Sequence, residues 1–398
     1  MICIVGAGLA GDSAAAALRA EGYGGRVLLI GDEAEAPYDR PPLSKEALFD
    51  DVPEDRLFLR AESWYEEQGI ELKLGDAVVA IDRDAHRLTL ASGETLDYEK
   101  LLLATGTRAR SLPGADSSGV PTFVVRTLAD ARGLRAELAP GKRVAVIGAG
   151  VIGLEVAASA IKRGCAVDVV EMADRVLSRV VPPALSDYMA DLHRANGTRL
   201  YLSVGSVTLT ATGVGTSVHG DIAADAVVIG IGVIPNDDLA RAAGLDCDNG
   251  IIVDAHARTS DPDIYAVGDA ARYPCPYGRG MVRCENWKHA QNHAVIAAKN
   301  MIGQVEAYAA ASSMWSDQFD VKLQTVGRIG ETGAILRGAF GSKKFMQIFC
   351  DADGVVIGAI GVNQAKDMRF AQVLIEKRKA IDPALLADPK ADLRKLAA

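Results

Sequence analysis

Two glycine-rich segments of this 398-residue chain have the same spacing. They are Gly6-Ala-Gly8-Leu-Ala-Gly11 and Gly148-Ala-Gly150-Val-Ile-Gly153. Between a strand and a helix, the first glycine permits a tight turn, the second lets a pyrophosphate approach the backbone, and the third lets the helix pack on the strand. The helix that follows offers free N–H groups to the phosphates. The chemistry predicted is the binding of two dinucleotides.

An acidic residue follows each glycine segment by roughly 20 residues, at the end of the next apolar run. Asp32 comes after residues 26–30, and Glu171 comes after residues 166–170. A carboxylate at this point accepts hydrogen bonds from the ribose of a bound dinucleotide. Because both segments carry the acid, chance glycines in an ordinary doubly wound protein are the weaker interpretation.

The elements that must position these residues are visible on either side of each segment. Apolar runs at 2–5 and 144–147 precede the glycines, and stretches rich in Ala and Leu follow them at 13–19 and 154–162. This pattern predicts strand, turn and helix twice. We therefore expect an α/β protein with two Rossmann-like dinucleotide-binding domains.

Later segments return the chain to the first of these domains, which predicts a domain insertion. Residues 75–98 have the alternation of a small antiparallel hairpin, and residues 204–229 repeat it. Strands end at Ala104-Thr105-Gly106 and at Gly230-Ile231-Gly232, and a further strand precedes Gly268-Asp269. We expect a first domain at 1–110 and 231–308, an inserted domain at 111–230, and a C-terminal α+β domain at 309–398.

Composition excludes several classes of function. The chain is 49% hydrophobic and 24% charged, as globular proteins are, and no apolar run is long enough to span a bilayer. Its first strand follows no targeting segment, so we expect a cytoplasmic protein without a membrane partner. The formal net charge of -9 argues against nucleic acid as a partner.

Cysteines and histidines give no metal or disulfide pattern. The six cysteines include no Cys-x-x-Cys pair. His289 and His293 stand four apart on an expected helix, but the Glu of a metalloprotease helix is missing between them. We expect an ordinary helix face there and no metal site.

One further segment is longer and more specific than a glycine fingerprint: Pro37-Tyr-Asp-Arg40-Pro41-Pro42-Leu43-Ser44-Lys45. It resembles the segment that passes beside the flavin in the two-dinucleotide flavoprotein reductases, which have a glutathione-reductase-like fold. The resemblance is strongest to the ferredoxin reductases that serve bacterial oxygenases, and it includes Trp315-Ser316-Asp317-Gln318 and residues 387–398. It implies FAD at the first fingerprint and a nicotinamide nucleotide at the second, in a domain inserted into the FAD domain.

The resemblance implies a set of FAD contacts. They are Gly6, Gly8, Ala10, Gly11, Asp32, Arg40, Lys45, Val78, Ala104, Thr105, Gly106, Arg126, Gly268, Asp269 and Trp287. Asp32 would bind the ribose, Val78 would lie on the adenine side, and Asp269 would lie near the ribityl phosphate. Trp287 would touch the isoalloxazine ring through its backbone. The alternatives are solvated charges for Lys45 and Arg126, a helix cap for Asp269 and a core aromatic for Trp287.

The resemblance also implies contacts to the nicotinamide nucleotide. They are Gly148, Gly150, Val151, Ile152, Gly153, Glu155, Glu171, Arg179 and Gly232. The carboxylate of Glu171 would accept from a free 2′-hydroxyl and repel a 2′-phosphate, and no Arg or Lys follows before Arg175. NADH is therefore predicted over NADPH.

The implied reaction is hydride transfer from NADH to FAD, followed by single-electron transfers to an external carrier. Lys45 and Glu155 would approach each other beside the flavin, and Trp315 would cover the edge where electrons leave, unless it only packs in the third domain. Disulfide- and peroxide-reducing relatives place cysteine near the flavin, whereas no cysteine lies between Cys3 and Cys165. We expect a [2Fe–2S] ferredoxin as the acceptor, and a monomer or homodimer.

Two alternatives remain open from the sequence. One is an NADH reductase of rubredoxin or of a small molecule on the same scaffold. The other is a redox interaction protein like apoptosis-inducing factor, although this chain lacks the long third-domain insertion expected there.

Docking of an acidic ferredoxin would need a basic patch. The candidates are Arg279, Arg283, Lys288, Lys343 and Lys344.

Overall fold

The first glycine fingerprint follows the central strand of a parallel sheet in the computed structural model, which describes residues 1–49, 51–115, 118–278 and 280–398. Strand β1 (Ile2–Val5) pairs with β2 (Val27–Ile30) on one side and with β7 (Lys100–Leu103) on the other. The edges are β3 (Ile70–Lys73) and β19 (Ile264–Ala266). All residues of β1 and β2 are buried, as expected for a parallel sheet covered on both faces.

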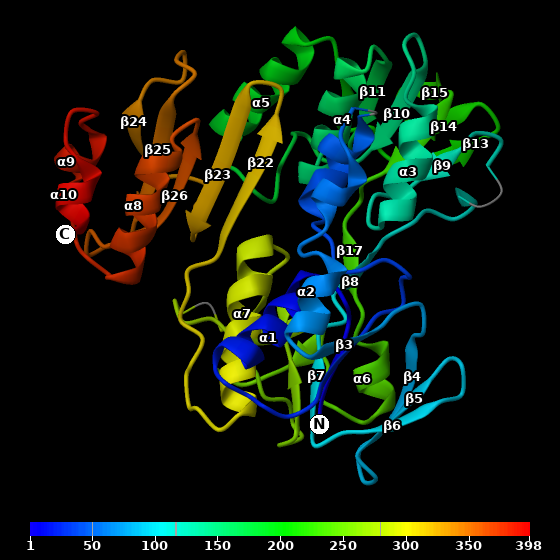
Figure 1. Cartoon of the computed structure of the whole chain (residues 1–398). Helices are drawn as coiled ribbons and strands as arrows, with labels where there is room; N and C mark the ends of the chain where they lie inside the picture. Colours follow the sequence, from blue (N-terminus) through cyan, green and yellow to red (C-terminus); the bar gives the residue numbers. More distant parts are fainter. Residues whose placement is uncertain (50, 116–117, 279) are drawn as a thin grey trace. The chain divides into compact units, whose positions relative to one another are not determined.

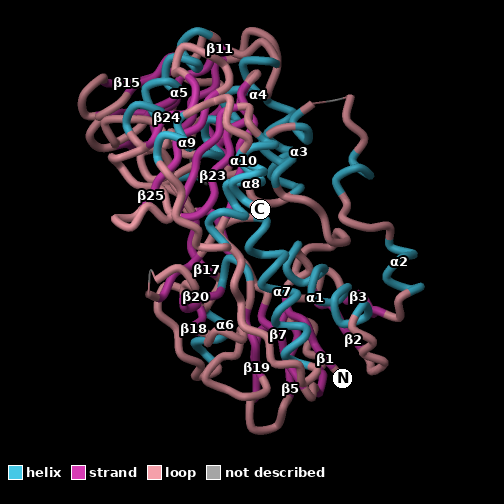
Figure 2. The backbone as a smooth tube through the Cα atoms, turned by 90° about the vertical axis from the view of Figure 1, so that its left-hand side faces the viewer, coloured by secondary structure: helices cyan, strands magenta, loops and turns pink. Residues whose placement is uncertain are grey.

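Alternate residues of β1 enter two different cores, as the pleat of a strand requires. Ile2 and Ile4 pack with helices α1 (Leu9–Ala20) and α7 (Trp287–Met301), which lie side by side (Figures 1 and 2). Cys3 and Val5 pack on the other face, against two small sheets, the antiparallel β4-β5-β6 and the mixed β18-β20-β21. Helix α1 begins directly after Gly8, four residues before the start predicted from the Ala-rich stretch.

The first of these sheets accounts for the strands predicted at 75–98. It has three strands, β4-β5-β6, and is not a two-stranded hairpin. The other elements of this part of the chain are short. The bounds are β4 (Val78–Asp82), β5 (Arg87–Leu90), β6 (Thr95–Asp97), α2 (Glu62–Glu67), α6 (Asp238–Ala242), β18 (Ile251–Ile252), β20 (Ala271–Pro274), β21 (Met281–Arg283), and the 3-10 turns η3 (Glu54–Leu57) and η5 (Gly268–Ala270).

The second fingerprint joins β10 (Arg143–Ile147) to α4 (Val151–Lys162) in a second parallel sheet. Its strand order is β12-β11-β10-β16-β9. The bounds are β9 (Thr122–Phe123), β11 (Ala166–Val170), β12 (Arg199–Tyr201), β16 (Ala226–Ile229), α3 (Leu128–Glu137), α5 (Pro183–Ala195), and an antiparallel layer of β13 (Val207–Thr210), β14 (Gly213–Thr216) and β15 (Gly220–Ala223). This layer corresponds to β4-β5-β6, which confirms that residues 204–229 repeat the pattern of residues 75–98.

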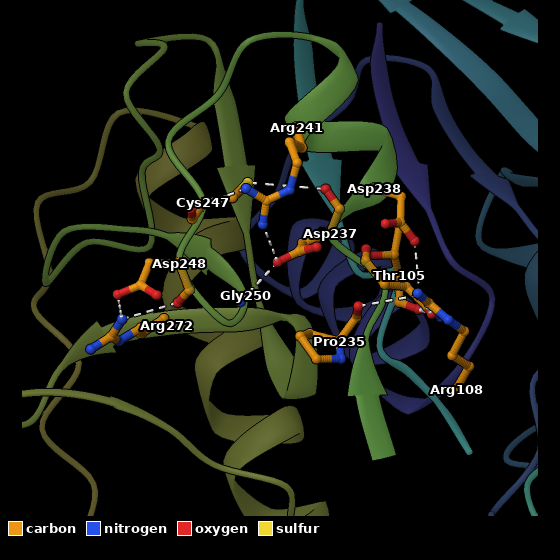
Figure 3. A network of polar contacts seen from close by, with 11 residues as sticks. Thr105, Arg108, Pro235, Asp237, Asp238, Arg241, Cys247, Asp248, Gly250 and Arg272 are labelled. Carbon is orange, nitrogen blue, oxygen red and sulfur yellow. Dashed lines mark hydrogen bonds and ion pairs between the residues drawn. The ribbon is translucent and has the colours of Figure 1, made fainter. Parts of the chain in front are cut away.

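The insertion predicted from the sequence is confirmed by the pairing of β19 with β7, because residues 104–263 separate these neighbours. The two connecting segments are bound together through side chains (Figure 3). Thr105 Oγ1 donates to the carbonyl of Asn236 at 2.7 Å, and Arg108 Nη1 donates to Asp238 at 2.8 Å. Strands β8 (Thr107–Ala109) and β17 (Val233–Pro235) pair at the same place.

The C-terminal region is an antiparallel sheet of order β22-β23-β26-β25-β24, with helix α8 on one face (Figure 1). Met368, Ala371 and Leu374 are buried on the sheet side of α8. The bounds are β22 (Ser313–Gln318), β23 (Val321–Gly327), β24 (Ile335–Gly338), β25 (Phe345–Cys350), β26 (Val356–Val362), α8 (Ala365–Glu376), α9 (Pro383–Ala387) and α10 (Leu393–Ala397).

The chain forms two compact units. The first contains residues 1–40, 53–108 and 233–312, and the second contains residues 41–52, 109–232 and 313–398. The three-domain boundaries at 1–110 with 231–308, 111–230 and 309–398 stay a prediction. The architecture itself confirms the predicted α/β class with two Rossmann-like sheets and a C-terminal α+β region.

Candidate functional site

Close backbone contacts leave no room for a side chain at two of the three glycines of the first fingerprint. A Cβ on Gly6, where φ is 114°, would lie 2.2 Å from the carbonyl oxygen of Ala104. A Cβ on Gly11 would lie 2.0 Å from the carbonyl oxygen of Gly6. At Gly8, by contrast, a Cβ would meet no described atom within 4 Å. The outer glycines are therefore fixed by packing, while the middle one borders open space of the kind that a phosphate needs.

The second fingerprint repeats this geometry closely. Gly148 has a φ of 103°, and its Cβ would lie 2.4 Å from the carbonyl oxygen of Gly230. A Cβ on Gly153 would lie 2.1 Å from the carbonyl oxygen of Gly148, and a Cβ on Gly150 would meet nothing described within 4 Å. The two turns form matched cradles.

Each cradle opens onto a helix N-terminus without a side-chain cap. Gly8 and Gly150 are the N-cap residues of α1 and α4, and neither end has a capping hydrogen bond from a side chain. The N–H groups of a first helical turn need partners from outside the helix, and they carry a partial positive charge. The residues at both turns therefore fit the pyrophosphate of a dinucleotide.

Each of the two predicted acids follows the strand next to its fingerprint strand, Asp32 after β2 and Glu171 after β11. Glu171 accepts hydrogen bonds from the backbone N–H of Ala149, at 2.7 Å, and of Ala173, at 2.8 Å. Its carboxylate is thereby held against the second glycine turn. Asp32 is exposed after β2, and its Oδ1 accepts from Glu33 N at 3.1 Å.

Two basic side chains, Arg175 and Arg179, follow Glu171 in the sequence. Arg175 donates to the carbonyls of Val181, at 2.8 Å, and Ser178, at 2.9 Å, and so organises the following loop. Arg179 is exposed in that loop, and its guanidinium lies 3.6 Å from where a Cβ of Gly232 would stand. The structure thus places Arg179 beside Gly232. Their contact with the nicotinamide nucleotide stays a prediction.

Several residues expected at the flavin gather around the first cradle. Gly268 has a φ of 69° and lies against Ala10, whose Cβ is 3.2 Å from where a Cβ of Gly268 would be. The adjoining Asp269 is in η5. Ala104 contacts Gly6, and Thr105 and Gly106 continue from it. The first fingerprint therefore lies next to both the end of strand β7 and the Gly268-Asp269 turn.

Other expected residues lie farther along the same unit. Arg40 forms an ion pair with Glu33 at 2.9 Å, and Glu33 also accepts from the hydroxyl of Tyr38 at 2.6 Å. Trp287 begins α7, and its Nε1 donates to Asp39 at 2.5 Å. Val78 begins β4 and packs against the core on the far face of the sheet.

In the second unit, Lys45 and Glu155 come together. Lys45 Nζ lies 3.3 Å from Glu155 Oε1, and the Glu155 side chain is only 2% exposed. Ser44 donates to Glu155 at 2.5 Å and Ser316 donates at 2.7 Å. Burial raises the pKa of Glu155, and the Lys45 ammonium and the hydroxyls oppose that rise.

The remaining residues expected at the flavin or at its edge also belong to the second unit. Arg126 precedes α3, and its N–H donates to Asp130 at 3.0 Å beside the capping box of that helix. Trp315 is half-buried on β22, opposite Gln324 of β23. The next residue of β22, Ser316, is the one that donates a hydrogen bond to Glu155.

The family model described as "Pyridine nucleotide-disulphide oxidoreductase" matches residues 1–294, and the model "Reductase C-terminal" matches residues 313–397. The chain belongs to the pyridine nucleotide-disulphide oxidoreductase family. It is accordingly an oxidoreductase that works with a flavin and NAD(H). The first match contains both cradles and Glu155, and the second contains Ser316.

Relatives within this family are similar over nearly their whole length. The anthranilate 1,2-dioxygenase system ferredoxin–NAD(+) reductase component of Burkholderia cepacia is 44% identical over 396 residues, covering 98% of each chain. Rhodocoxin reductase of Rhodococcus erythropolis is 40% identical, covering 99% of this chain and 93% of that one.

Solved structures of ferredoxin reductases are also similar to this chain over nearly their whole length. The ferredoxin reductase for the CYP199A2 system from Rhodopseudomonas palustris has a TM-score of 0.93 at 40% identity, covering 100% of this chain and 99% of that one. Putidaredoxin reductase, in a covalent complex with putidaredoxin, has a TM-score of 0.93 at 38% identity, covering 99% and 97%.

Two features of this family member were missed by sequence reasoning. The first is the pair of serines, Ser44 and Ser316, that donate to Glu155. The second is the environment of His289 and His293, which are buried among rings with Tyr273 stacked on His289 at 4.6 Å. Burial lowers the pKa of His289 to about 3, so this imidazole is neutral at ordinary pH.

The described residues offer little other chemistry. All six cysteines are free thiols. No group of acids, histidines and cysteines in the described part of the chain could hold a metal ion. Among the helices described, none is both long and apolar enough to cross a bilayer.

The glycine geometry predicts that alanine substitutions at Gly153 and Gly150 will affect different properties, stability at Gly153 and NADH binding at Gly150. Gly153→Ala forces a methyl group onto a backbone carbonyl and should lower the free energy of unfolding by about 2 kcal/mol or more. Gly150→Ala meets no described atom, so it should cost less than about 1 kcal/mol while weakening NADH binding. Urea unfolding and NADH titration measure the two effects. A Gly150→Ala protein that binds NADH as tightly as the wild type would contradict this placement of the pyrophosphate.

Proposed function

We propose that the chain is an NADH-dependent ferredoxin reductase that holds FAD and delivers single electrons to a [2Fe–2S] ferredoxin serving an oxygenase. The observation that carries this proposal is the pair of dinucleotide cradles, in a chain that aligns end to end with ferredoxin–NAD(+) reductase components. One cradle serves the electron donor and the other serves the flavin. No cysteine lies between Cys3 and Cys165 to store electrons as a disulfide.

The first cradle is assigned to FAD. Gly6, Gly8, Ala10 and Gly11 would bind the pyrophosphate, and Asp32 would bind the ribose. The convergence of Gly268 with Ala10 supports placing Asp269 at the flavin side of the same ligand. The further residues proposed for FAD are Arg40, Lys45, Val78, Ala104, Thr105, Gly106, Arg126 and Trp287. When bound, FAD accepts the hydride of NADH and releases its electrons one at a time.

The second cradle is assigned to NADH. Gly148, Gly150, Val151, Ile152 and Gly153 would hold the pyrophosphate at the start of α4. Glu171 would accept from the 2′-hydroxyl, and its ties to Ala149 and Ala173 hold the carboxylate in place for that contact. Arg179 and Gly232 would line the site farther along, and Glu155 would orient the carboxamide of the nicotinamide.

Lys45, Glu155 and Trp315 are the residues proposed to act closest to the electron transfer. The ammonium of Lys45 would stabilise negative charge that develops during reduction, and Glu155 balances that ammonium when the charge is absent. The indole of Trp315 would shield the point where electrons leave. No general base is needed, because the reaction moves a hydride and electrons.

The candidates for ferredoxin docking differ in their surroundings. Arg283 is mostly buried and forms an ion pair with Glu285 at 2.8 Å, which weakens its candidacy. Lys343 pairs with Asp320. Lys288 and Lys344 are exposed, while Arg279 lies outside the described residues. Among the described candidates, Lys288 and Lys344 are therefore better placed than Arg283 to contribute to a docking patch.

Coenzyme preference tests the assignment of the second cradle. Glu171→Gln keeps an acceptor for Ala149 N but removes the negative charge that repels a 2′-phosphate. The ratio of kcat/KM for NADH to that for NADPH should fall roughly tenfold. Asp174→Asn, which neutralises an exposed acid three residues later, is the matched control and should leave the ratio unchanged. An unchanged ratio in Glu171→Gln would remove Glu171 from the ribose site.

The role of Lys45 is tested by single-turnover reduction of the flavin with NADH. Lys45→Met keeps the length of the side chain but removes the ammonium, so flavin bleaching should slow roughly tenfold at neutral pH. Lys162→Met is the control, because its ammonium lies on the same helix as Glu155 and contacts the carbonyl of Phe319 at 3.5 Å. Equal bleaching rates in Lys45→Met and wild type would show that the ammonium is not used.

The acceptor is tested by NADH-dependent reduction of cytochrome c, with and without an added [2Fe–2S] ferredoxin. The rate should rise many-fold with ferredoxin, and the rise should shrink as salt screens the charged surfaces. Reduction that is equally fast without ferredoxin would favour a reductase of small molecules. Stimulation by rubredoxin in place of ferredoxin would favour the rubredoxin alternative.

A further inference from the structure

A line of buried polar side chains runs from Glu155 of α4 through strand β22 to helix α5. Ser316 Oγ donates to Glu155 Oε1 at 2.7 Å, and Gln318 Nε2 donates to Ser316 Oγ at 2.9 Å. Gln318 Oε1 in turn lies 2.9 Å from His193 Nε2. All four residues are at most 2% exposed. Buried polar groups in such numbers require a reason beyond packing, because each must be taken out of water.

The pleat of β22 creates this line. Residues 316 and 318 point to one face of the strand, which packs against α4, and residues 315 and 317 point to the other. The segment Trp315-Ser316-Asp317-Gln318 thus contributes Trp315 on one face and two hydrogen-bonding groups on the other. The C-terminal region thereby reaches the carboxylate of Glu155 on helix α4.

The direction of each hydrogen bond can be deduced from the donors available. Ser316 has one hydroxyl proton, and Gln318 already donates to its oxygen, so the proton points to Glu155. The amide oxygen of Gln318 then faces His193 Nε2, which must carry the imidazole proton. His193 Nδ1 is left to accept from Thr198 at 3.4 Å. Every donor in the line points toward Glu155.

The other groups facing Glu155 also donate to it. Ser44 and Lys45 approach from the 41–45 segment, and the hydroxyl of Ser159 on α4 fixes Ser44 by donating to its carbonyl at 2.8 Å. Asp168 of β11, the other buried carboxylate among the described residues of this unit, is paired with Arg199 at 2.5 Å. The neighbours of Glu155 are hydrogen-bond donors, so they favour its ionised form over a protonated form that would need an acceptor.

We infer that Ser316, Gln318 and His193 are positioning residues that keep Glu155 ionised and correctly aimed at the nicotinamide nucleotide. This inference rests on the proposed function, in which Glu155 contacts that nucleotide. It assigns the strand β22 a part in the reaction that is separate from the role proposed for Trp315. Ser316 acts directly on the carboxylate, Gln318 orients Ser316, and His193 in one tautomer orients Gln318.

The expected effect of removing Ser316 has a definite sign. Burial raises the pKa of Glu155, and each donated hydrogen bond lowers it. Ser316→Ala removes one donor, so the pKa of Glu155 rises, and the ionised form is lost at a higher pH as the solution is acidified. The acid limb of the pH profile for flavin reduction by saturating NADH should therefore move up by about one pH unit.

Matched variants separate this effect from general damage. Ser316→Thr keeps the hydroxyl and should retain the wild-type acid limb. Gln318→Met removes the group that orients Ser316 and should move the limb in the same direction, but less far. Ser186→Ala deletes an equally buried serine hydroxyl, which donates to the carbonyl of Val176 at 2.6 Å, and should leave the limb in place.

A second readout does not depend on turnover. Infrared difference spectra of the flavin-loaded protein without NADH report the carboxylic C=O stretch of protonated Glu155, identified by its loss in Glu155→Gln. The pH at which this band appears should rise in Ser316→Ala by the same amount as the acid limb. If Ser316→Ala does not fold, Gln318→Met provides the measurement.

The outcomes distinguish the two proposals. Wild-type acid limbs and wild-type infrared titrations in both Ser316→Ala and Gln318→Met would overturn the positioning role while leaving the reductase intact. A wild-type protein whose flavin is not reduced by NADH would overturn the proposed function. A shifted infrared titration in that case would still establish the hydrogen bonding to Glu155.

Discussion

A helix that starts at the end of a buried strand forces two stretches of backbone into contact, and the rest of this structure depends on that contact being possible. At Gly11 a Cβ would stand 2.0 Å from the carbonyl oxygen of Gly6, and at Gly153 it would stand 2.1 Å from that of Gly148. Any side chain there would push the helix away from its strand. The first N–H groups of the helix would then no longer converge on the turn. One steric condition thus fixes the sheet, the helix and the phosphate cradle together.

The parts of the fold that obey such local conditions could be predicted from the sequence. The runs at 2–5 and 144–147 are strands, and each leads into a glycine turn, a helix and an acid. The predicted start of helix α1 is too late, because Gly11 lies within its first turn and glycine has a low helix propensity. Strands β6 and β9 are only three and two residues long, so they are too short to show a periodic pattern. Their positions depend on longer neighbouring strands.

The surroundings of the candidate site were less predictable, because they depend on contacts between distant residues. Ser44 and Ser316 lie 111 and 161 residues from Glu155 in the sequence. The sequence contains a signal, since Ser316 and Gln318 alternate on a strand whose interior face is otherwise apolar, but it does not name their partner. The same holds for His289 and His293. Their spacing predicts a shared helix face, whereas Tyr273 and Tyr308, which enclose that face, come from other elements.

The buried Lys45–Glu155 pair is best explained by chemistry and not by stability. Removing two charges from water costs several kcal/mol for each ion, and apolar side chains of similar volume often stabilise a core as well or better. The structure nevertheless surrounds Glu155 with three donors, which offset the cost of its charge. Ser44, next to Lys45, presents a hydroxyl that cannot be oxidised to a disulfide. In the proposed function, the 41–45 segment therefore adjusts the charge beside the flavin and offers no thiol that could store electrons.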